Sequence, residues 1–323
     1  MKRYAGIFAY AIGSACVVLP HMGLSQAYPS KPIRVVVPFP PGGVDLPMRL
    51  IQARMAESLG QPIVIENRAG ANGYIGSENV ARSAPDGYSV LATSASTIVT
   101  GPLISKSVPF DPVKDFTPIT MLTRSVNVFV VNSLPVKSVK ELVDYAKRSP
   151  GKLSYASSGV GSSQHMDGEA FKLAAGVNMV HVPYKGGGPE VQAILAGEIE
   201  VALVTYQQIH SYLSSGKVRI LATYDGKRFP GLSNVPDVIE TVPNFQKSAS
   251  WIGVLGPAGF PRPIAMRLYE SIAKAINAPD IRPKLDSDSL IVANTPDEFV
   301  EAIRMDIEQT SKIVKSLGIK FEE

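Results

Sequence analysis

A strand, a glycine loop and a helix follow one another directly near the start of this chain, and their order restricts the fold more than any other segment. The apolar run at 33–37 leads into a loop at 38–43, and an amphipathic pattern then runs from Asp45 to Leu59. A short apolar run before a turn is typical of a buried strand, and the first N–H groups of the following helix face the loop. The segment therefore predicts a site for an anion. It leaves open whether that anion is a passing ligand, a cofactor phosphate or a reacting substrate.

Strands and helices alternate along the chain in two groups. In the first group we expect strands at 33–37, 63–65 and 88–92, with helices at 45–59 and 73–83 between them. The second group has expected strands at 126–131, 153–156, 179–182, 201–204 and 219–222, and a last strand at 252–255 precedes helices at 263–277 and 295–318. Strands separated by helices favour an α/β fold with parallel sheets covered on both faces.

The helix signals divide the chain into domains. Ser138 with Glu141, and Thr295 with Glu298, have the spacing of capping boxes and predict helix starts. The glycines that we expect to end helices are Gly60, Gly197 and Gly216. Because the C-terminal helices need a sheet to pack on, we expect residues 28–126 and 252–323 to form one domain and residues 127–251 the other. Two crossings would then link the domains as a hinge.

The N-terminus resembles an export signal. Two basic residues precede an apolar stretch at 5–19, and Ser25 and Ala27 occupy the −3 and −1 positions of a cleavage site. The stretch is short for a bilayer span. This pattern predicts a signal peptide at residues 1–27, cleaved after Ala27, and hence a periplasmic protein. The alternatives are a retained anchor, or a lipoprotein attached at Cys16.

Composition excludes several classes of protein. Cys16 is the only cysteine, so the mature chain has no internal disulfide, no thiolate metal site and no cysteine nucleophile. The remaining 296 residues are enough for two domains with large cores. Loss of Lys2 and Arg3 lowers the formal net charge from +4 to +2, and no Lys/Arg run suits nucleic acid.

The loops that follow the expected strands are rich in glycine and hydroxyl groups. They are residues 39–43, 93–97, 157–163, 183–188 and 205–206. In parallel sheets, ligands bind at the carboxyl ends of the strands. These loops offer backbone N–H groups, hydroxyls and two tyrosines, and Lys185 is their only cation. That inventory suits a small carboxylate held by neutral donors, each hydrogen bond to the ionised group contributing about 1.5–3 kcal/mol.

Each candidate residue also has a structural interpretation. Gly42 and Gly43 form a tight turn with or without a ligand, and Asp45 serves as an N-cap. Lys185 fits an ordinary solvated lysine, and Tyr206 fits the core as well as the cleft. The loop at 157–163 could equally be a plain flexible loop.

The sequence carries no convincing catalytic or cofactor motif. It has no G-x-S-x-G elbow, no G-x-G-x-x-G fingerprint and no P-loop. The four histidines, His21, His165, His181 and His210, lack metal-ligand spacing. We therefore expect no metal, no cofactor and no enzymatic activity. A pairing of Ser163 with His165 keeps an enzyme acting on small acids as an alternative.

Eight short motifs resemble one protein family, in order and over essentially the whole mature chain. They are YPSKPIRVVVPFPPGG at 28–43, QPIVIENR at 61–68, APDGY at 84–88, PFDPVKDF at 109–116, LSYASSG at 153–159, GSSQH at 161–165, HVPYKG at 181–186, and SW at 250–251 leading to GPAG at 256–259. Together they resemble the Bug proteins, the substrate-binding proteins of tripartite tricarboxylate transporters.

The resemblance implies a two-domain periplasmic-binding-protein (Venus flytrap) fold, with a parallel-rich sheet flanked by helices in each domain. It also implies that the protein closes on a small organic acid and delivers it to a membrane permease of two subunits, one large and one small. We expect the protein to be a monomer. The residues that it implies for ligand binding are Phe39, Pro41, Gly42, Gly43, Asp45, Thr93, Ser94, Ser158, Gly161, Ser162, Ser163, His165, Tyr184, Lys185, Gly186 and Tyr206.

One departure from the family pattern affects the first loop. The family usually places two residues between the glycine pair and the aspartate, whereas only Val44 stands between Gly43 and Asp45 here. The shortening therefore affects the role of Asp45 and the shape of the pocket at this corner. Di- and tricarboxylates and aromatic acids all fit the loops, while the lack of an obvious acidic partner for an amine disfavours amino acids. A second possible role is presentation of the bound acid to a sensor kinase.

Overall fold

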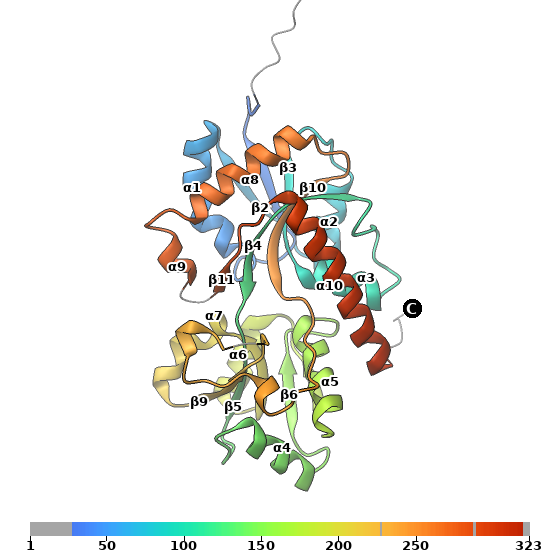
Figure 1. Cartoon of the computed structure of the whole chain (residues 1–323), viewed down its shortest axis with the longest axis vertical. Helices are drawn as coiled ribbons and strands as arrows, with labels where there is room; N and C mark the ends of the chain where they lie inside the picture. Colours follow the sequence, from blue (N-terminus) through green and yellow to red (C-terminus); the bar gives the residue numbers. More distant parts are fainter. Residues whose placement is uncertain (1–27, 227, 287–288, 319–323) are drawn as a thin grey trace, which may run out of the picture.

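The chain forms two lobes stacked along the longest axis of the molecule, each built on its own sheet (Figure 1). The computed structural model describes residues 28–226, 228–286 and 289–318. The predicted signal peptide, its cleavage point and Cys16 therefore lie outside the described residues. We call the lobe that contains the first strand the upper lobe, and the other the lower lobe.

The upper lobe contains a six-stranded sheet with the order β11-β4-β10-β3-β1-β2. Its strands are β1 (Ile33–Val37), β2 (Ile63–Asn67), β3 (Ser89–Ser94), β4 (Phe116–Ser125), β10 (Trp251–Pro257) and β11 (Ser289–Ile291). The apolar sides of α1 (Leu46–Leu59) and α8 (Arg262–Ile276) pack on one face of this sheet. The other face is covered by α2 (Tyr74–Ala81) and the first half of α10 (Pro296–Leu317).

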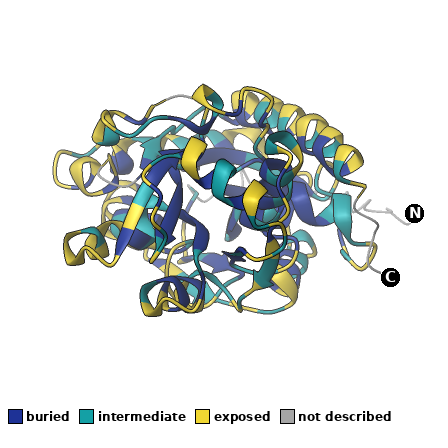
Figure 2. Ribbon diagram, turned by 90° about the horizontal axis from the view of Figure 1, so that it is seen from below, coloured by how far each residue is buried: buried dark blue, intermediate teal, exposed yellow. Residues whose placement is uncertain are grey.

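The lower lobe contains a five-stranded sheet with the order β7-β6-β8-β5-β9. Its strands are β5 (Asn127–Asn132), β6 (Ser154–Ser157), β7 (Val180–Pro183), β8 (Val201–Thr205) and β9 (Val218–Thr223). One face packs against α4 (Val139–Arg148) and α5 (Ser163–Ala175), and the other against α6 (Gly187–Ala196) and α7 (Tyr206–Ile209). In Figure 2 the strands of the interior are buried and the outer sides of the helices are exposed.

The expectation of parallel pairing is correct for part of each sheet only. β1 is parallel to β2 and β3, and β6 is parallel to β7 and β8. In contrast, β10 runs antiparallel to β3 and β4, and β5 runs antiparallel to β8 and β9. The reason is the crossing between lobes. A strand that enters a lobe from the other one starts at the edge where the parallel strands end, so it must run in the opposite direction.

Two strands were not expected from the sequence. β11 has only three residues, and its pairing with β4 is what makes it a strand. β4 contains Pro118, which disfavours a central strand. The proline lies opposite Leu255, where the pairing of β4 with β10 shifts register. A bulge of this kind removes the need for a ladder N–H at that point.

The helix signals correspond to real helix ends, with one difference. Thr295 and Glu298 form both halves of a capping box at the start of α10. Ser138 accepts a hydrogen bond from the Glu141 N–H, but the Glu141 carboxylate accepts from Lys137 N–H instead of from Ser138. The glycines that end helices in the left-handed conformation, as expected, are Gly60, Gly197 and Gly216.

Helix α10 belongs to both lobes. Phe299 and Ile303 near its start pack in the core of the upper lobe, whereas Ile313 and Val314 near its end pack in the core of the lower lobe. Figure 1 shows the helix running beside α3 (Gly101–Ile104) and on toward α5. The lobes are thus joined by this helix as well as by the two chain crossings.

Candidate functional site

The loops at the carboxyl ends of β1, β3, β6 and β8 lie at the level where the two lobes meet (Figure 1). The lobes touch there through Ser96 and Ser163. The Ser96 hydroxyl accepts a hydrogen bond of 3.4 Å from the Ser163 N–H and lies 3.5 Å from the Ser163 hydroxyl. Ser163 is the first residue of α5. The amino end of this helix therefore faces the upper lobe, where it favours negative charge.

The first predicted loop presents open backbone. Pro41, Gly42 and Gly43 are exposed, and a β-carbon built on either glycine would meet no atom within 4 Å. Phe39 is half-buried, and its ring packs so closely against Gly73 that a side chain at 73 would lie 3.1 Å from it. The Phe39 ring thus fixes one end of the loop against Gly73, and the space next to Gly42 and Gly43 is open.

Asp45 does not cap the helix that it precedes. Its carboxylate, 1% exposed, accepts hydrogen bonds from Gly42 N–H at 2.7 Å, Arg49 Nε at 2.6 Å and Asn67 Nδ2 at 3.3 Å. Burial would raise the pKa of Asp45, but the hydrogen bonds from Gly42, Arg49 and Asn67 outweigh it and lower that pKa. The N-cap interpretation is therefore wrong for the side chain. The Asp45 carboxylate also occupies the Gly42 N–H, a donor that the sequence assigned to a ligand.

The two residues predicted at the end of β3 differ in access. Thr93 is fully buried, and its hydroxyl has no hydrogen-bond partner among the described residues. Only its backbone is therefore in a position to serve a ligand. Ser94 is half-buried, and its hydroxyl lies 3.5 Å from that of Thr97.

In the lower lobe, the loop at 157–163 is held by a dense set of hydrogen bonds. Ser158 donates to Gln164 Oε1 at 2.9 Å, and Ser162 caps α5 by accepting from His165 N–H at 3.2 Å. The His165 Nδ1 atom accepts from Gly161 N–H at 3.1 Å. Gly161 has φ +78°, a conformation that side chains rarely adopt. The loop is a defined structure, which argues against the interpretation as a plain flexible loop.

The loop at 184–186 is hydrogen-bonded to the loop at 157–163. The N–H groups of Tyr184 and Gly186 donate to the carbonyls of Ser157 and Ser158, both at 3.0 Å. Burial, followed by the charges of Glu198 and Glu190, raises the pKa of Tyr184, so its hydroxyl stays protonated and able to donate.

Lys185 and Tyr206 occupy different settings. Lys185 is exposed, which agrees with a solvated lysine. Tyr206 is half-buried at the first position of α7, with its ring 5.6 Å from that of His210. The predicted loops therefore lie together where the two lobes meet. The side chains of Asp45 and Thr93 are the exceptions, because they are almost fully buried.

A cavity adjoins these loops on the side of α3. It measures about 640 Å³ and is lined from the upper lobe by Asn72 and Ile104, among others, and from the lower lobe by Gly161 and His165. Asn72, which sequence reasoning missed, has φ +55°. Its position between glycines, in Gly70-Ala-Asn-Gly73, is the one sequence signal that could have indicated it.

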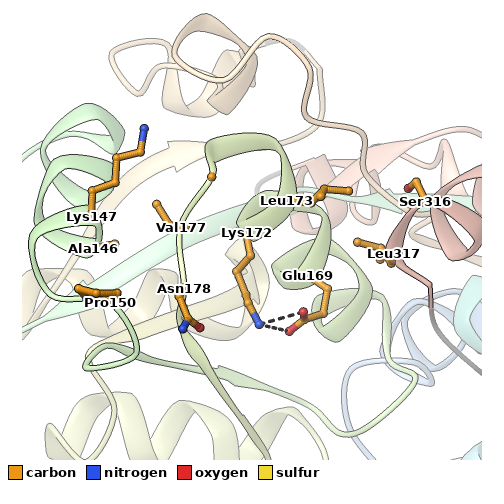
Figure 3. Close-up of a pocket in the computed structure, with 11 residues that line it drawn as sticks. Ala146, Lys147, Pro150, Glu169, Lys172, Leu173, Val177, Asn178, Ser316 and Leu317 are labelled. Atoms are coloured by element: carbon orange, nitrogen blue, oxygen red, sulfur yellow. Dashed lines mark hydrogen bonds and ion pairs between the residues drawn. The ribbon is translucent and has the colours of Figure 1, made fainter.

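A further cavity lies on the outside of the lower lobe and contains none of the predicted site residues. It measures about 530 Å³, between α4, α5 and the end of α10 (Figure 3). Lys172 and Glu169 form an ion pair in it, with Nζ–O distances of 2.8 and 2.9 Å. Its location places it apart from the loops at the strand ends.

Within the part of the chain that the structure describes, no cluster of three or more His, Cys, Asp or Glu residues is arranged to hold a metal ion. No helix in that part is long and apolar enough to cross a membrane.

Two α/β lobes joined by chain crossings, with ligand-type loops where the lobes meet, define the class of two-lobed solute-binding proteins. The chain belongs to the TctC family, the tripartite tricarboxylate transporter family receptors, and matches that family over residues 48–319. Binding proteins of this family are periplasmic.

Three solved structures show the likeness over the whole described fold. Rpa4515 from R. palustris with adipate is 33% identical, with a TM-score of 0.85 over 91% of this chain and 100% of that chain. The periplasmic binding protein BugD is 29% identical, with a TM-score of 0.82 over 91% and 100%. MatC from Rhodopseudomonas palustris with bound malate is 30% identical, with a TM-score of 0.80 over 89% and 100%. The resemblance to Bug proteins and the periplasmic-binding-protein fold are thereby confirmed.

Proposed function

We propose that this chain captures a small dicarboxylate between its two lobes and passes it, chemically unchanged, to a two-subunit permease in the inner membrane. The observation that carries the proposal is the likeness to two relatives whose structures contain adipate and malate. Both acids present two carboxylates on a short chain. The loops of this protein offer hydroxyls and backbone N–H groups, which are suitable donors for such charges.

The ligand would be held by both lobes. We propose that the donors are the open backbone at Gly43, the Ser94 hydroxyl, the amino end of α5 at Ser163 and the Tyr184 hydroxyl. Ser158, whose hydroxyl donates to Gln164 Oε1, would line the site. A ligand closes two lobes only if it contacts both, because it shifts an equilibrium by its difference in affinity for the two states. Pro41, Gly161, Gly186 and Tyr206 would shape the walls of this site.

The domain division underlies the closing motion. We propose that residues 28–126 with 252–323, and residues 127–251, move as two bodies about the crossings at Val126 and near Ser248. Because Ile313 and Val314 of α10 are packed in the lower core, we expect this helix to restrain the closure.

We further propose export with cleavage after Ala27, a monomeric mature protein and no turnover of the ligand. The Ser–His alternative has little support. His165 Nδ1 is already an acceptor for Gly161 N–H, and the Ser163 hydroxyl lies against Ser96. N-terminal sequencing of the periplasmic fraction tests the cleavage point, and any other first residue contradicts it.

The test of binding is a thermal-shift and calorimetric screen of the mature chain against adipate, malate, tricarboxylates, aromatic acids and amino acids. Ligand at about 100 times its Kd stabilises the folded state by about 2.7 kcal/mol, so a true ligand raises Tm clearly. We expect a dicarboxylate to lead the series. A screen in which no acid raises Tm would refute the proposal. Recovery of the bound acid unchanged, by mass spectrometry, separates binding from catalysis.

A further inference from the structure

Two histidines hold the two ends of the loop at 157–163. At the first end, the His181 Nε2 atom lies 2.6 Å from the Ser157 hydroxyl. That hydroxyl in turn accepts from Gly159 N–H at 3.2 Å. Further along the loop, His165 Nδ1 accepts from Gly161 N–H at 3.1 Å. His181 comes from β7 and His165 from α5, so elements on both sides clamp the loop.

The two imidazoles form one stack. Their ring centroids are 4.1 Å apart with an angle of 15°, and the Tyr155 ring is also stacked on His181, with a centroid distance of 4.9 Å. The Tyr155 hydroxyl donates to Glu169 at 2.7 Å, and Glu169 is paired with Lys172. The stack is therefore held by β6 and α5. Because both imidazoles bond to the loop at 157–163, protonation of either ring should affect that loop.

We propose that His165 and His181 are positioning residues for ligand binding, and that protonation of His165 releases the Gly161 end of the loop and weakens affinity for the acid. This inference rests on the proposed function. His165 was predicted to contact the ligand, but its Nδ1 lone pair is used by the loop backbone. An imidazole protonated on both nitrogens has no acceptor, so the bond to Gly161 N–H cannot survive protonation.

Burial keeps one of the two histidines, His181, neutral. Burial, followed by the charge of His165, lowers the pKa of His181 to about 4. His181 therefore stays neutral near pH 6, where an ordinary imidazole begins to protonate. The groups that face the stack are Glu169 and Lys172 on α5 and Tyr155 on β6. From the upper lobe, Glu78 and Tyr74 line the cavity that His165 also lines.

The test compares His165→Asn with His165→Leu. Asparagine places its Oδ1 atom near the position of Nδ1, so it keeps an acceptor for Gly161 N–H but cannot titrate. Leucine removes the acceptor. Calorimetry with adipate or malate at about pH 8 and about pH 6 keeps these acids largely ionised. We expect wild type to bind more weakly at the lower pH, with about tenfold, the factor for one hydrogen bond of about 1.4 kcal/mol, as the upper limit.

The variants carry distinct expectations. His165→Asn should bind like wild type at about pH 8 and lose the pH dependence, while His165→Leu should bind about tenfold more weakly at both values. Leu173→Gln, on the outer side of α5 where Leu173 is 59% exposed, is the control and should match wild type. Wild-type affinity in His165→Leu, or an unchanged pH slope in His165→Asn, overturns the inference.

A readout without ligand keeps the inference apart from the proposed function. In wild type, the amide resonance of Gly161 should shift as His165 titrates, and in His165→Asn it should not. If the Gly161 resonance is indifferent to pH in wild type, the positioning role is refuted even if an acid binds. If it shifts but no acid binds, the hydrogen bond stands and the proposed function fails, and with it the claim about affinity.

Discussion

The carboxylate of Asp45 accepts a 2.7 Å hydrogen bond from the backbone N–H of Gly42, three residues earlier in the chain. Val44 alone stands between Gly43 and Asp45, one residue fewer than the family usually has. The Asp45 carboxylate thus accepts from a backbone N–H that the sequence analysis had assigned to a ligand carboxylate. We regard Asp45 as the residue that gives the first loop its shape.

Replacing Asp45 with alanine should destabilise the protein by about 1–3 kcal/mol, because Gly42 N–H and Asn67 lose their acceptor.

The stabilising effect of Asp45 should depend on pH, because its pKa is lowered in the folded state. Its carboxylate stabilises the fold above the ordinary pKa of 3.8 and loses that effect as the pH falls through the lowered folded-state pKa. Urea unfolding should therefore show a gap between wild type and Asp45→Asn at neutral pH that narrows in acid. Asp144→Ala, which breaks an exposed pair with Lys140, is the control and should change stability little. Equal stability of Asp45→Ala and wild type would contradict the role.

Gly43→Val should abolish most ligand binding without unfolding the protein. A β-carbon at Gly43 meets no atom within 4 Å, so the fold accommodates valine while the side chain fills the space in front of the loop. We expect at least about a tenfold loss of affinity, equal to about 1.4 kcal/mol, and little change in Tm. Calorimetry and thermal melts measure the two. Val64→Thr, at a half-exposed position of β2, is the control. Unchanged affinity would exclude this loop from the site.

Glu190 should make the protein less stable as the pH rises. It is fully buried in α6, and neither carboxylate oxygen has a partner among the described residues. Burial raises its pKa well above 4.5. A group whose pKa is raised on folding stabilises the folded state fully at pH values below its unfolded-state pKa. That stabilisation is lost as the pH rises from the unfolded-state pKa through the folded-state pKa. Glu190→Gln should therefore flatten the decline in unfolding free energy above about pH 4.5, as measured by urea titration at several pH values. Glu198→Gln, at an exposed site, should leave the decline in place, and a decline that persists in Glu190→Gln would disprove the assignment.

Asp167 is expected to act in the same direction at the second crossing. Its Oδ1 atom accepts from the Ser248 N–H at 2.6 Å and from the Ser248 hydroxyl at 2.8 Å. Burial raises the pKa of Asp167 to about 7, despite the opposing hydrogen bonds from Ser248. Stability should therefore fall between the ordinary pKa of 3.8 and about 7. Asp167→Asn keeps an acceptor for Ser248 and should be more stable than wild type at about pH 8, by on the order of a few kcal/mol. A variant that is less stable than wild type at that pH would show that the charged form is the stabilising one.

Local patterns determined most of the elements and the family. Apolar runs between turn residues placed nine strands, and glycine and capping-box spacing placed helix ends, because these signals act within a few residues. The failures were non-local. β11 became a strand only by pairing with β4, and Pro118 was tolerated only where β4 and β10 change register.

The sequence by itself determined that this chain alternates strand and helix, ends its strands in loops rich in donors, and resembles the Bug proteins. Only the tertiary structure decided which donors are available. It turned the Asp45 carboxylate toward the Gly42 N–H, buried Thr93, and stacked His165 on His181, where both bond to the loop at 157–163. Residue type and spacing specify what a side chain can donate or accept. Whether that capacity is still unused depends on neighbours that are distant in the chain and that meet only when the two lobes fold.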